Sequence, residues 1–281
     1  MEEHKKRKSK LSAALLVLAG FLRLGAVSRL PTKGVKTAKV INSVFLLMPL
    51  LVLSLVGCTI FGFQNNNLIE SVIPVKKSSG WWELRHNEKI NQAKNTEIDL
   101  LMIGDSITHG WENAGKEVWK EFYQDKNAMN LGFSGDRTEH VLWRIQNGAV
   151  HDVTPKLIVL MIGTNNTGHR MVPAGHTAKG ISTIISELRI RLPMSKILLV
   201  GIFPRQHSST NILRQRNNEV NQLISKLDDN EVVFYLNINE VFLDKNKILD
   251  TKIMPDLLHP SRLGYQLWAE AMTATINRLM E

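Results

Sequence analysis

The chain has 281 residues, and 43% of them are hydrophobic, which suits one large domain with a tail or two small domains and excludes a disordered chain. Its net charge of +9 is concentrated at one end, because residues 1–40 carry +8 and the other 241 residues carry about +1. A nucleic-acid-binding protein should hold its positive charge on the folded domain, so this distribution argues against nucleic acid as a partner.

An uncharged apolar stretch of twenty residues, 44–63, follows the basic region and is long enough to span a bilayer. Within it, Leu55-Val56-Gly57-Cys58 resembles a bacterial lipobox, in which small residues precede a cysteine that becomes lipidated. A plain membrane helix with a chance cysteine is the alternative. Under both interpretations the basic residues before the stretch predict a membrane-anchored domain on the extracytoplasmic side.

We therefore expect residues 1–63 to form a basic leader and a signal or anchor segment, with Cys58 as the lipidation site of a bacterial lipoprotein. Residues 1–34 are long for such a leader, and one hypothesis is that translation starts at Val35. Residues 64–80 are polar and include a Ser78-Ser79-Gly80 turn, so we expect a linker there. The globular domain is predicted to cover residues 81–281, beginning with two tryptophans as packing anchors.

Short apolar runs alternate with amphipathic patterns along this domain. The runs predict strands over Ile98–Ile103, Ala128–Leu131, Leu157–Ile162, Ile197–Ile202 and Val232–Leu236. The amphipathic patterns predict helices over Trp111–Tyr123, Arg137–Asn147, Thr177–Arg191, Asn211–Leu227 and Arg262–Met280. This alternation predicts an α/β fold with a five-stranded parallel sheet covered by helices on both sides, and such sheets bind ligands at the carboxyl ends of their strands.

Glycine-containing polar motifs follow the first three predicted strands: Gly104-Asp105-Ser106, Gly132–Asp136 and Gly163–Asn166. We expect these loops to meet at one edge of the sheet. Ser106 is the candidate nucleophile, because it lies at a strand-to-helix turn where the helix N-terminus favours negative charge nearby. The alternative is that Asp105 and Ser106 only cap the helix.

A serine hydroxyl needs a base, and His259 is the preferred one among nine histidines. Asp256 stands three residues before it, a spacing that lets the carboxylate accept the imidazole N–H and fix the tautomer. An isolated Asp-x-x-His also occurs as a capping or surface pair. The competing histidines near the motif loops are His109, His140, His169 and His176.

Attack on an ester carbonyl places negative charge on its oxygen, which positioned N–H groups stabilise. The candidate donors are the backbone amides of Ser106 and Gly135 and the side-chain amide of Asn165. The alternative is that these glycine and asparagine residues are turn formers only. Asn166 is adjacent to Asn165, and residue chemistry alone does not decide between them.

The motifs together resemble the SGNH (GDSL) hydrolase family, whose named residues match Ser106, Gly135, Asn165 and His259, with Asp256 as the acid. Residues 130–144 and Phe203-Pro204-Arg205 are particularly similar to the catalytic subunits of intracellular platelet-activating-factor acetylhydrolase. The resemblance runs from about Ile98 to the C-terminus. It implies a three-layer α/β/α fold of flavodoxin-like type, a Ser106–His259–Asp256 triad, no metal or other cofactor, and a preference for short acyl groups such as acetyl.

The anchor and the resemblance together suggest a bacterial secreted esterase that removes acetyl groups from carbohydrates. The expected partners are a carbohydrate or small-molecule acyl ester and the membrane, with no nucleic acid. The alternatives are a lysophospholipase, thioesterase or acyltransferase on the same site, an inactive carbohydrate-binding protein, and a metallohydrolase that uses Asp256 and His259 but lacks a clustered third ligand. The oligomeric state stays open, with a homodimer as one alternative. Trp111 and Arg144 are candidate substrate contacts, although a core aromatic and an intradomain ion pair are the favoured interpretations.

Overall fold

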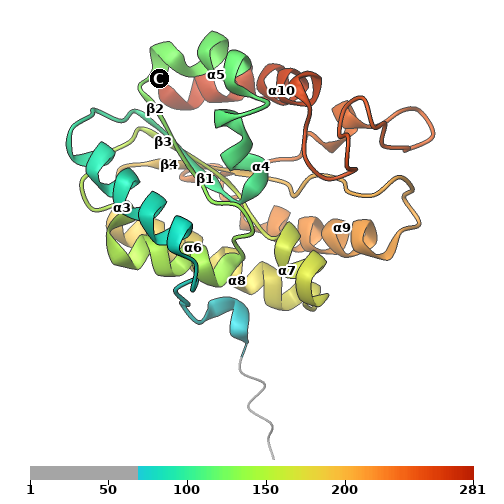
Figure 1. The fold of residues 1–281 in the computed structure, drawn as a ribbon, viewed down its shortest axis with the longest axis horizontal. Coiled ribbons are helices and arrows are strands. Elements are labelled where there is room, and N and C mark those ends of the chain that lie inside the picture. The colour runs from blue at the N-terminus through green and yellow to red at the C-terminus, as the bar shows by residue number, and fades with distance from the viewer. Residues whose placement is uncertain (1–68) are drawn as a thin grey trace, which may run out of the picture. The chain divides into compact units, whose positions relative to one another are not determined.

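A five-stranded parallel sheet forms the centre of the computed structural model, which describes residues 69–281 (Figure 1). The strands are β1 (Leu100–Gly104), β2 (Ala128–Gly132), β3 (Leu157–Met161), β4 (Lys196–Val200) and β5 (Val233–Leu236). Their order in the sheet is β2-β1-β3-β4-β5, and every neighbouring pair is parallel. The predicted anchor and Cys58 lie outside the described residues. Within 69–281, the structure contains no helix with the length and apolar character needed to cross a bilayer.

The central strands are buried on both faces, which explains their uninterrupted apolar sequences. All residues of β1 and β3 are buried. Because successive side chains point to opposite faces, Leu101 and Ile103 enter one hydrophobic core while Leu100 and Met102 enter the other. The sheet therefore separates two cores, each of which needs a covering layer of helices.

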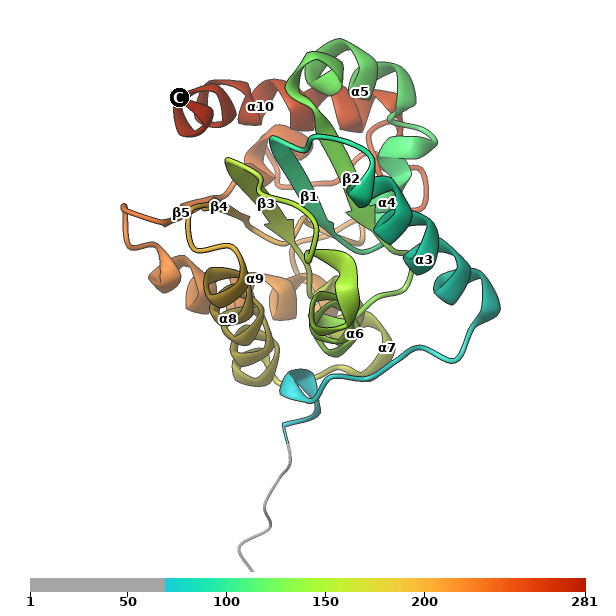
Figure 2. The same ribbon diagram turned by 90° about the vertical axis from the view of Figure 1, so that its left-hand side faces the viewer.

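Helices cover both faces of the sheet (Figures 1 and 2). One core is closed by α3 (Gly80–Lys94), α6 (Thr138–Arg144), α8 (Ala174–Arg191) and α9 (Ile212–Ile224). The other is closed by α4 (Ser106–His109), α5 (Lys116–Tyr123) and α10 (Arg262–Met280). Helix α7 (Thr164–Arg170) follows β3. The short helices are η1 (Glu70–Val72), η2 (Gly110–Glu112), η3 (Gln124–Lys126), η4 (Ile145–Ala149), η5 (Ser225–Leu227) and η6 (Asn239–Phe242). The predicted three-layer α/β/α fold is confirmed.

Several helical regions differ from the sequence expectation, among them α7, which begins within the expected loop Gly163–Asn166. Helix α3 is not predicted, because only Trp82, His86 and Ala93 are buried along it and its apolar periodicity is correspondingly weak. The predicted helix over Trp111–Tyr123 is interrupted, and α5 begins only at Lys116. Here the chain turns tightly, with the N–H of Gly115 donating to the carbonyl of Gly110 at 3.0 Å.

Residues 69–80, expected to belong to a linker, lie against the domain in the structure. Ser71 is buried, and its carbonyl accepts a hydrogen bond from Thr138 Oγ1 at 2.9 Å. The N–H of Val75 donates to the carbonyl of Glu139 at 3.1 Å. These contacts hold the segment along α6. The sequence offers little sign of them, because the segment has no apolar periodicity.

Candidate active site

Helix α4 begins at Ser106, directly over the ends of β1 and β2, and two glycines make this close approach possible. A Cβ atom on Gly132 would lie 2.1 Å from the backbone nitrogen of His109, and one on Gly104 would lie 2.1 Å from Oγ1 of Thr108, which also belongs to α4. Any side chain at these positions would push α4 away from the sheet. The glycines thus fix the place of Ser106.

Two hydrogen bonds hold α4, one from the residue that precedes it and one from α10. The Asp105 carboxylate caps the helix by accepting from the N–H of Ile107 at 3.0 Å. Tyr265 of α10 donates its hydroxyl proton to the carbonyl of Ile107 at 2.7 Å. Asp105 therefore has the capping role, whereas the hydroxyl of Ser106 points elsewhere.

Ser106, His259 and Asp256 form a continuous hydrogen-bonded chain. His259 Nε2 lies 2.8 Å from Ser106 Oγ, and His259 Nδ1 lies 2.6 Å from Asp256 Oδ2. Burial raises the pKa of Asp256, but hydrogen bonds from the ring and backbone of His259 outweigh it and hold the pKa below its usual range. An ionised carboxylate only accepts, so Nδ1 carries the proton and Nε2 is free to accept from the serine hydroxyl.

The turn that carries Asp256 and His259 has an unusual backbone. Asp256 Oδ1 accepts from the N–H groups of Leu258 at 3.1 Å and His259 at 2.7 Å. Leu257, which lies between Asp256 and Leu258, adopts a φ of 59°. This is the left-handed region, which costs a residue with a Cβ about 1–2 kcal/mol. Its carbonyl accepts from the N–H of Gln206 at 2.8 Å. The neighbouring loop therefore helps to hold the turn in the conformation that aims His259 at Ser106.

The loop after β2 is built around the buried carboxylate of Asp136. This carboxylate accepts from Trp82 Nε1 at 2.7 Å and from Arg144 Nε at 2.9 Å. Burial raises its pKa, and the charge of Arg144 opposes that effect. Gly135, the residue before it, has a φ of 73°, so the loop needs a glycine there. Trp82 is thus the packing anchor expected from sequence, while its neighbour Trp81 is 45% exposed.

The loops after β2 and β3 meet across the end of β1. Asn165, the second residue of α7, donates from Nδ2 to the backbone carbonyl of Asp136 at 2.9 Å. Because β1 lies between β2 and β3, this bond places Gly135 and Asn165 on either side of the strand end that carries Ser106. The structure thus gathers all five predicted site residues at one sheet edge.

The two adjacent asparagines have different surroundings. Asn166 is fully buried, accepts from the N–H of Thr138 at 3.1 Å and donates from Nδ2 to Thr138 Oγ1 at 3.1 Å. Its amide also lies 3.3 Å from Glu139 Oε2 and 3.4 Å from Ser71 Oγ. Asn166 therefore joins α7 to α6 and η1, whereas Asn165 binds the loop that carries Gly135.

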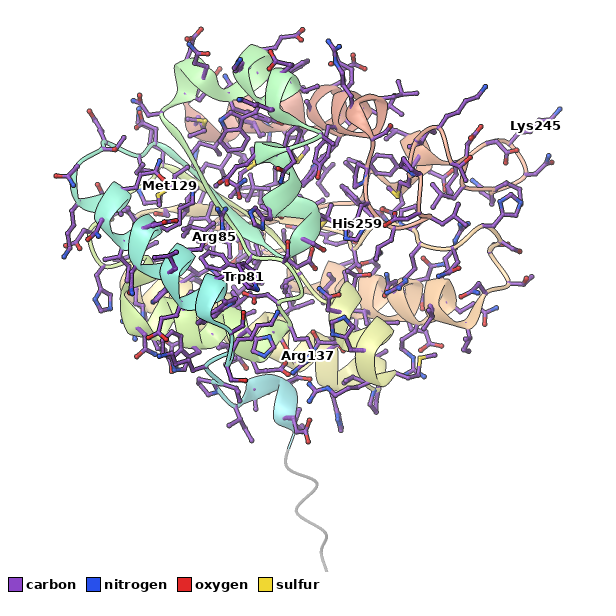
Figure 3. All side chains as sticks on the ribbon, in the orientation of Figure 1. Trp81, Arg85, Met129, Arg137, Lys245 and His259 are labelled. Atoms are coloured by element: carbon purple, nitrogen blue, oxygen red, sulfur yellow. The ribbon has the colours of Figure 1, made fainter. Side chains whose placement is uncertain are left out.

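Side chains next to Gly135 make a set of contacts that was not expected from sequence. His109 Nδ1 lies 3.0 Å from Ser134 Oγ, and the exposed Trp81 ring stacks on His109 with centroids 6.3 Å apart (Trp81 is labelled in Figure 3). Lys77 donates from Nζ to the carbonyl of Ser134 at 2.9 Å. Lys77 lies in a polar segment without a motif, so its sequence carries no signal for this position.

The candidate substrate contacts Trp111 and Arg144 lie in the interior. Trp111 is buried against Tyr265 and Trp268, with ring centroids 4.5 and 4.7 Å away. Arg144 is fully buried beside Asp136. Both match the core interpretations. Within residues 69–281, no three His, Cys, Asp or Glu side chains gather into a group that would hold a metal ion.

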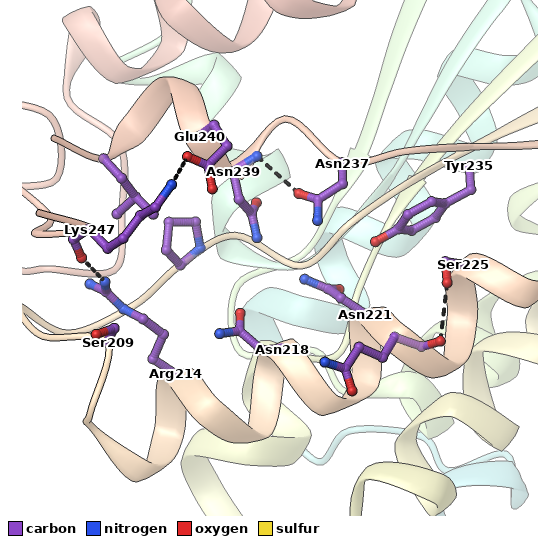
Figure 4. Close-up of a pocket in the computed structure, with 13 residues that line it drawn as sticks. Ser209, Arg214, Asn218, Asn221, Ser225, Tyr235, Asn237, Asn239, Glu240 and Lys247 are labelled. Atoms are coloured by element: carbon purple, nitrogen blue, oxygen red, sulfur yellow. Dashed lines mark hydrogen bonds and ion pairs between the residues drawn. The ribbon is translucent and has the colours of Figure 1, made fainter. Parts of the chain in front are cut away.

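A separate polar groove of about 490 Å³ lies between α9 and the chain after β5 (Figure 4). Asn218 and Asn221 of α9 face Asn237 and Asn239 across it, and Tyr235 lines one end. Neither Ser106 nor His259 lines this groove. It opens beyond the carboxyl ends of β4 and β5, and therefore at the same edge of the parallel sheet as Ser106.

A serine hydroxyl, an imidazole and a carboxylate meet at the edge of the sheet where its parallel strands end. Together with the fold, they define an α/β/α hydrolase of the SGNH type. Comparison with known proteins agrees: residues 102–267 match the model of the GDSL-like lipase/acylhydrolase family, and the chain belongs to this family. The protein is a carboxylic ester hydrolase, as the sequence resemblance predicts.

Curated relatives support this assignment, and solved structures share the fold. The chain is 32% identical to the human platelet-activating factor acetylhydrolase IB subunit alpha1 over 73% of its length and 86% of the relative, and 34% identical to the rat subunit alpha2 over 71% and 85%. A GDSL-like lipase of Bacteroides thetaiotaomicron has the same fold, with a TM-score of 0.57 and 18% identity. The match covers 70% of this chain and 97% of the lipase. An acetylxylan esterase of Geobacillus stearothermophilus also has this fold, with a TM-score of 0.52 and 17% identity. The match covers 66% of this chain and 96% of the esterase.

Proposed function

We propose that this protein is a membrane-tethered serine esterase that removes short acyl groups, acetyl above all, from hydroxyl-rich substrates. The observation that carries the catalytic part is the 2.8 Å contact between Ser106 Oγ and His259 Nε2, continued by the 2.6 Å contact between His259 Nδ1 and Asp256. In this arrangement the base and the nucleophile already lie at hydrogen-bonding distance without any rearrangement.

The mechanism follows from the proton positions. His259 removes the proton of Ser106 as its oxygen attacks the ester carbonyl, and Asp256 stabilises the imidazolium that results. His259 then protonates the leaving alcohol, which departs and leaves an acyl-serine. A water molecule loses its proton to His259, attacks the acyl-serine, and the serine oxygen regains a proton as the acid is released.

The negative charge on the carbonyl oxygen is assigned to three donors: the N–H groups of Ser106 and Gly135 and the side-chain amide of Asn165. Their loops flank one strand end, and the Asn165 amide is fixed by its bond to the carbonyl of Asp136. Donors held in place before the reaction need little reorganisation, and each typically contributes about 3 kcal/mol to transition-state stabilisation.

Two observations favour an acetylated carbohydrate as substrate. Relatives and structural neighbours include an acetylhydrolase and an acetylxylan esterase. The groove of Figure 4 presents neutral hydrogen-bonding groups, mainly the amides of Asn218, Asn237 and Asn239 and the phenol of Tyr235. Its charged members are already paired, because Glu240 binds Lys247, and Arg214 donates to four backbone carbonyls. Such a surface suits the many hydroxyl groups of a sugar chain.

The cellular location is proposed from the N-terminal sequence. The basic residues before the apolar stretch 44–63 orient the catalytic domain to the extracytoplasmic side, and Cys58 is the candidate site for lipid attachment. Mass spectrometry of the mature N-terminus tests this directly. A lipid-modified residue 58 supports a lipoprotein, whereas a mature protein that retains residues 1–57 contradicts it.

The experiment for catalysis compares full-length wild-type and Ser106→Ala proteins in the hydrolysis of p-nitrophenyl acetate, butyrate and octanoate and of acetylated xylan. We expect Ser106-dependent turnover that declines with acyl length. Preference for the long chain would favour a lysophospholipase or thioesterase instead. An absence of turnover together with an absence of Ser106 labelling by a fluorophosphonate would favour an inactive binding protein.

A further inference from the structure

The ammonium group of Lys77 lies against the backbone of Gly135. Lys77 Nζ donates to the carbonyl of Ser134 at 2.9 Å, and a Cβ atom on Gly135 would lie 2.7 Å from the same nitrogen. The ammonium therefore occupies the space that a side chain on residue 135 would need. Lys77 precedes Ser134 by 57 residues in the sequence. The contact places the positive charge of Lys77 at the edge of the candidate site.

The carbonyl of Ser134 and the N–H of Gly135 belong to one peptide group. The peptide is planar, and the described chain contains no cis bonds, so this carbonyl and this N–H point in opposite directions. A cation bound to the carbonyl therefore fixes the direction of the N–H on the far side. It also withdraws electron density from the peptide and makes that N–H a stronger donor, as in other hydrogen-bonded chains.

We propose that Lys77 is a positioning residue for ester hydrolysis, which orients and polarises the Ser134–Gly135 peptide so that the N–H of Gly135 meets the developing oxyanion. The inference rests on the proposed catalytic function. It assigns a role in catalysis to the segment before α3, which the sequence marks only as a linker.

The surroundings of Lys77 hold the ammonium at this place. The N–H of Ser79 donates to the carbonyl of Lys77 at 3.0 Å, and Nζ lies 5.7 Å from the centre of the Trp81 ring. Burial lowers the pKa of Lys77, while the nearby carboxylate of Asp136 favours its charged form. A freely solvated lysine would need none of these contacts. Its neighbour Lys76 pairs with Glu83 at 2.6 Å and lies 5.7 Å from the centre of the Trp143 ring, but its ammonium has no hydrogen bond to the loop after β2.

The test uses full-length K77M, K77R and the matched control K76M, with p-nitrophenyl acetate as substrate. We expect K77M to lower kcat about 10- to 100-fold with KM changed less than about twofold, because the polarised donor acts mainly in the transition state. K77R should recover at least part of the loss, and K76M should behave as wild type. The rate of labelling by a fluorophosphonate should fall in parallel with kcat.

Wild-type kcat in K77M, or an equal loss in K76M, overturns the proposal while leaving the esterase function intact. If K77M does not fold, as judged by its melting temperature, K77Q is measured instead, and wild-type kcat in that variant is equally decisive against the role. Failure of the esterase function itself gives a different result, namely no difference between wild-type and Ser106→Ala proteins, and it removes the basis of this inference as well.

Discussion

The side-chain amide of Asn165 is bound to the backbone carbonyl of Asp136 at 2.9 Å, so that α7 and the loop after β2 are joined over the end of β1. The amide has a second N–H, for which residues 69–281 provide no acceptor within hydrogen-bonding distance. One N–H thus fixes the side chain, and the proposed oxyanion role belongs to the other. Variants of Asn165 and of its neighbour Asn166 can therefore be compared directly in their effects on catalysis and on stability.

Asn165→Ala should lower kcat by about 10²–10³ with little change in KM, because the lost donor acts on charge that exists only in the transition state. Steady-state kinetics with p-nitrophenyl acetate measure this. Asn166→Ala should instead lower the free energy of unfolding by about 1–3 kcal/mol, since it leaves the N–H of Thr138 buried without its acceptor. A large loss of kcat in a stable Asn166→Ala protein would reverse the assignment of the two residues.

Ser106→Ala should abolish measurable turnover while the melting temperature stays close to that of wild type, because the side chain loses one hydroxyl at a partly exposed position. Labelling by a fluorophosphonate should disappear with it. Ser134→Ala is the matched control, since Ser134 lies in the same site and its hydroxyl contacts His109. We expect Ser134→Ala to be labelled; near-native hydrolysis by Ser106→Ala would contradict the proposed nucleophile.

Asp105→Asn should stabilise the protein in a pH-dependent way. Burial raises the pKa of Asp105 to about 7, the charge of Asp136 adds to this effect, and the N–H of Ile107 opposes it. The unfolded value is roughly 4, so between about pH 4 and 7 the folded protein binds more protons than the unfolded one and loses stability as the pH rises. Asparagine keeps an acceptor for Ile107 but does not ionise.

Urea unfolding of both proteins at pH 4.5, 6 and 8 measures this effect as a difference in free energy. The gain from Asp105→Asn should grow with pH and level off above about pH 7, with an upper value of about 4 kcal/mol. Contributions from other titrating groups cancel in the difference. A gain that is equal at all three pH values would contradict a raised pKa.

Arg144→Met should lower the free energy of unfolding by about 3–5 kcal/mol, because the Asp136 carboxylate would stay buried with the Trp82 N–H as its remaining side-chain donor. Urea unfolding at pH 7 measures the loss. Lys120→Ala provides the control, since the Lys120–Glu117 pair is 52% and 60% exposed and should change stability by less than about 1 kcal/mol. Similar losses in the two variants would show that Asp136 does not depend on its partner.

The sheet was predictable because each strand needs a continuous apolar run to be buried on both faces. Strand ends were harder to place: the run at Ile197–Ile202 suggests a longer strand, but β4 ends at Val200 and the N–H of Ile202 donates to Asn221 Oδ1 at 2.7 Å. That acceptor comes from α9, nineteen residues later, and no local pattern encodes it.

The candidate site was predictable as a set of motifs, because parallel strands bring their carboxyl-end loops to one edge. The choice between Asn165 and Asn166 was not, since it depends on which amide meets the distant Thr138 and Ser71. Lys77 was missed for a similar reason. Its position is fixed by contacts of residues 71–79 with α6, and a polar segment gives no periodic sign of such packing.

The position of residues 71–77 on the domain has a consequence for shortened forms of the protein. Cleavage on the amino-terminal side of residue 69 would leave the contact between Ser71 and Thr138 and that between Lys77 and Ser134 in the carboxyl-terminal fragment. Cleavage just before Trp81 would spare every strand and all five motif residues, yet it would discard both contacts. With Lys77 in its proposed positioning role, two fragments with the same sheet should therefore differ in their rate of ester hydrolysis.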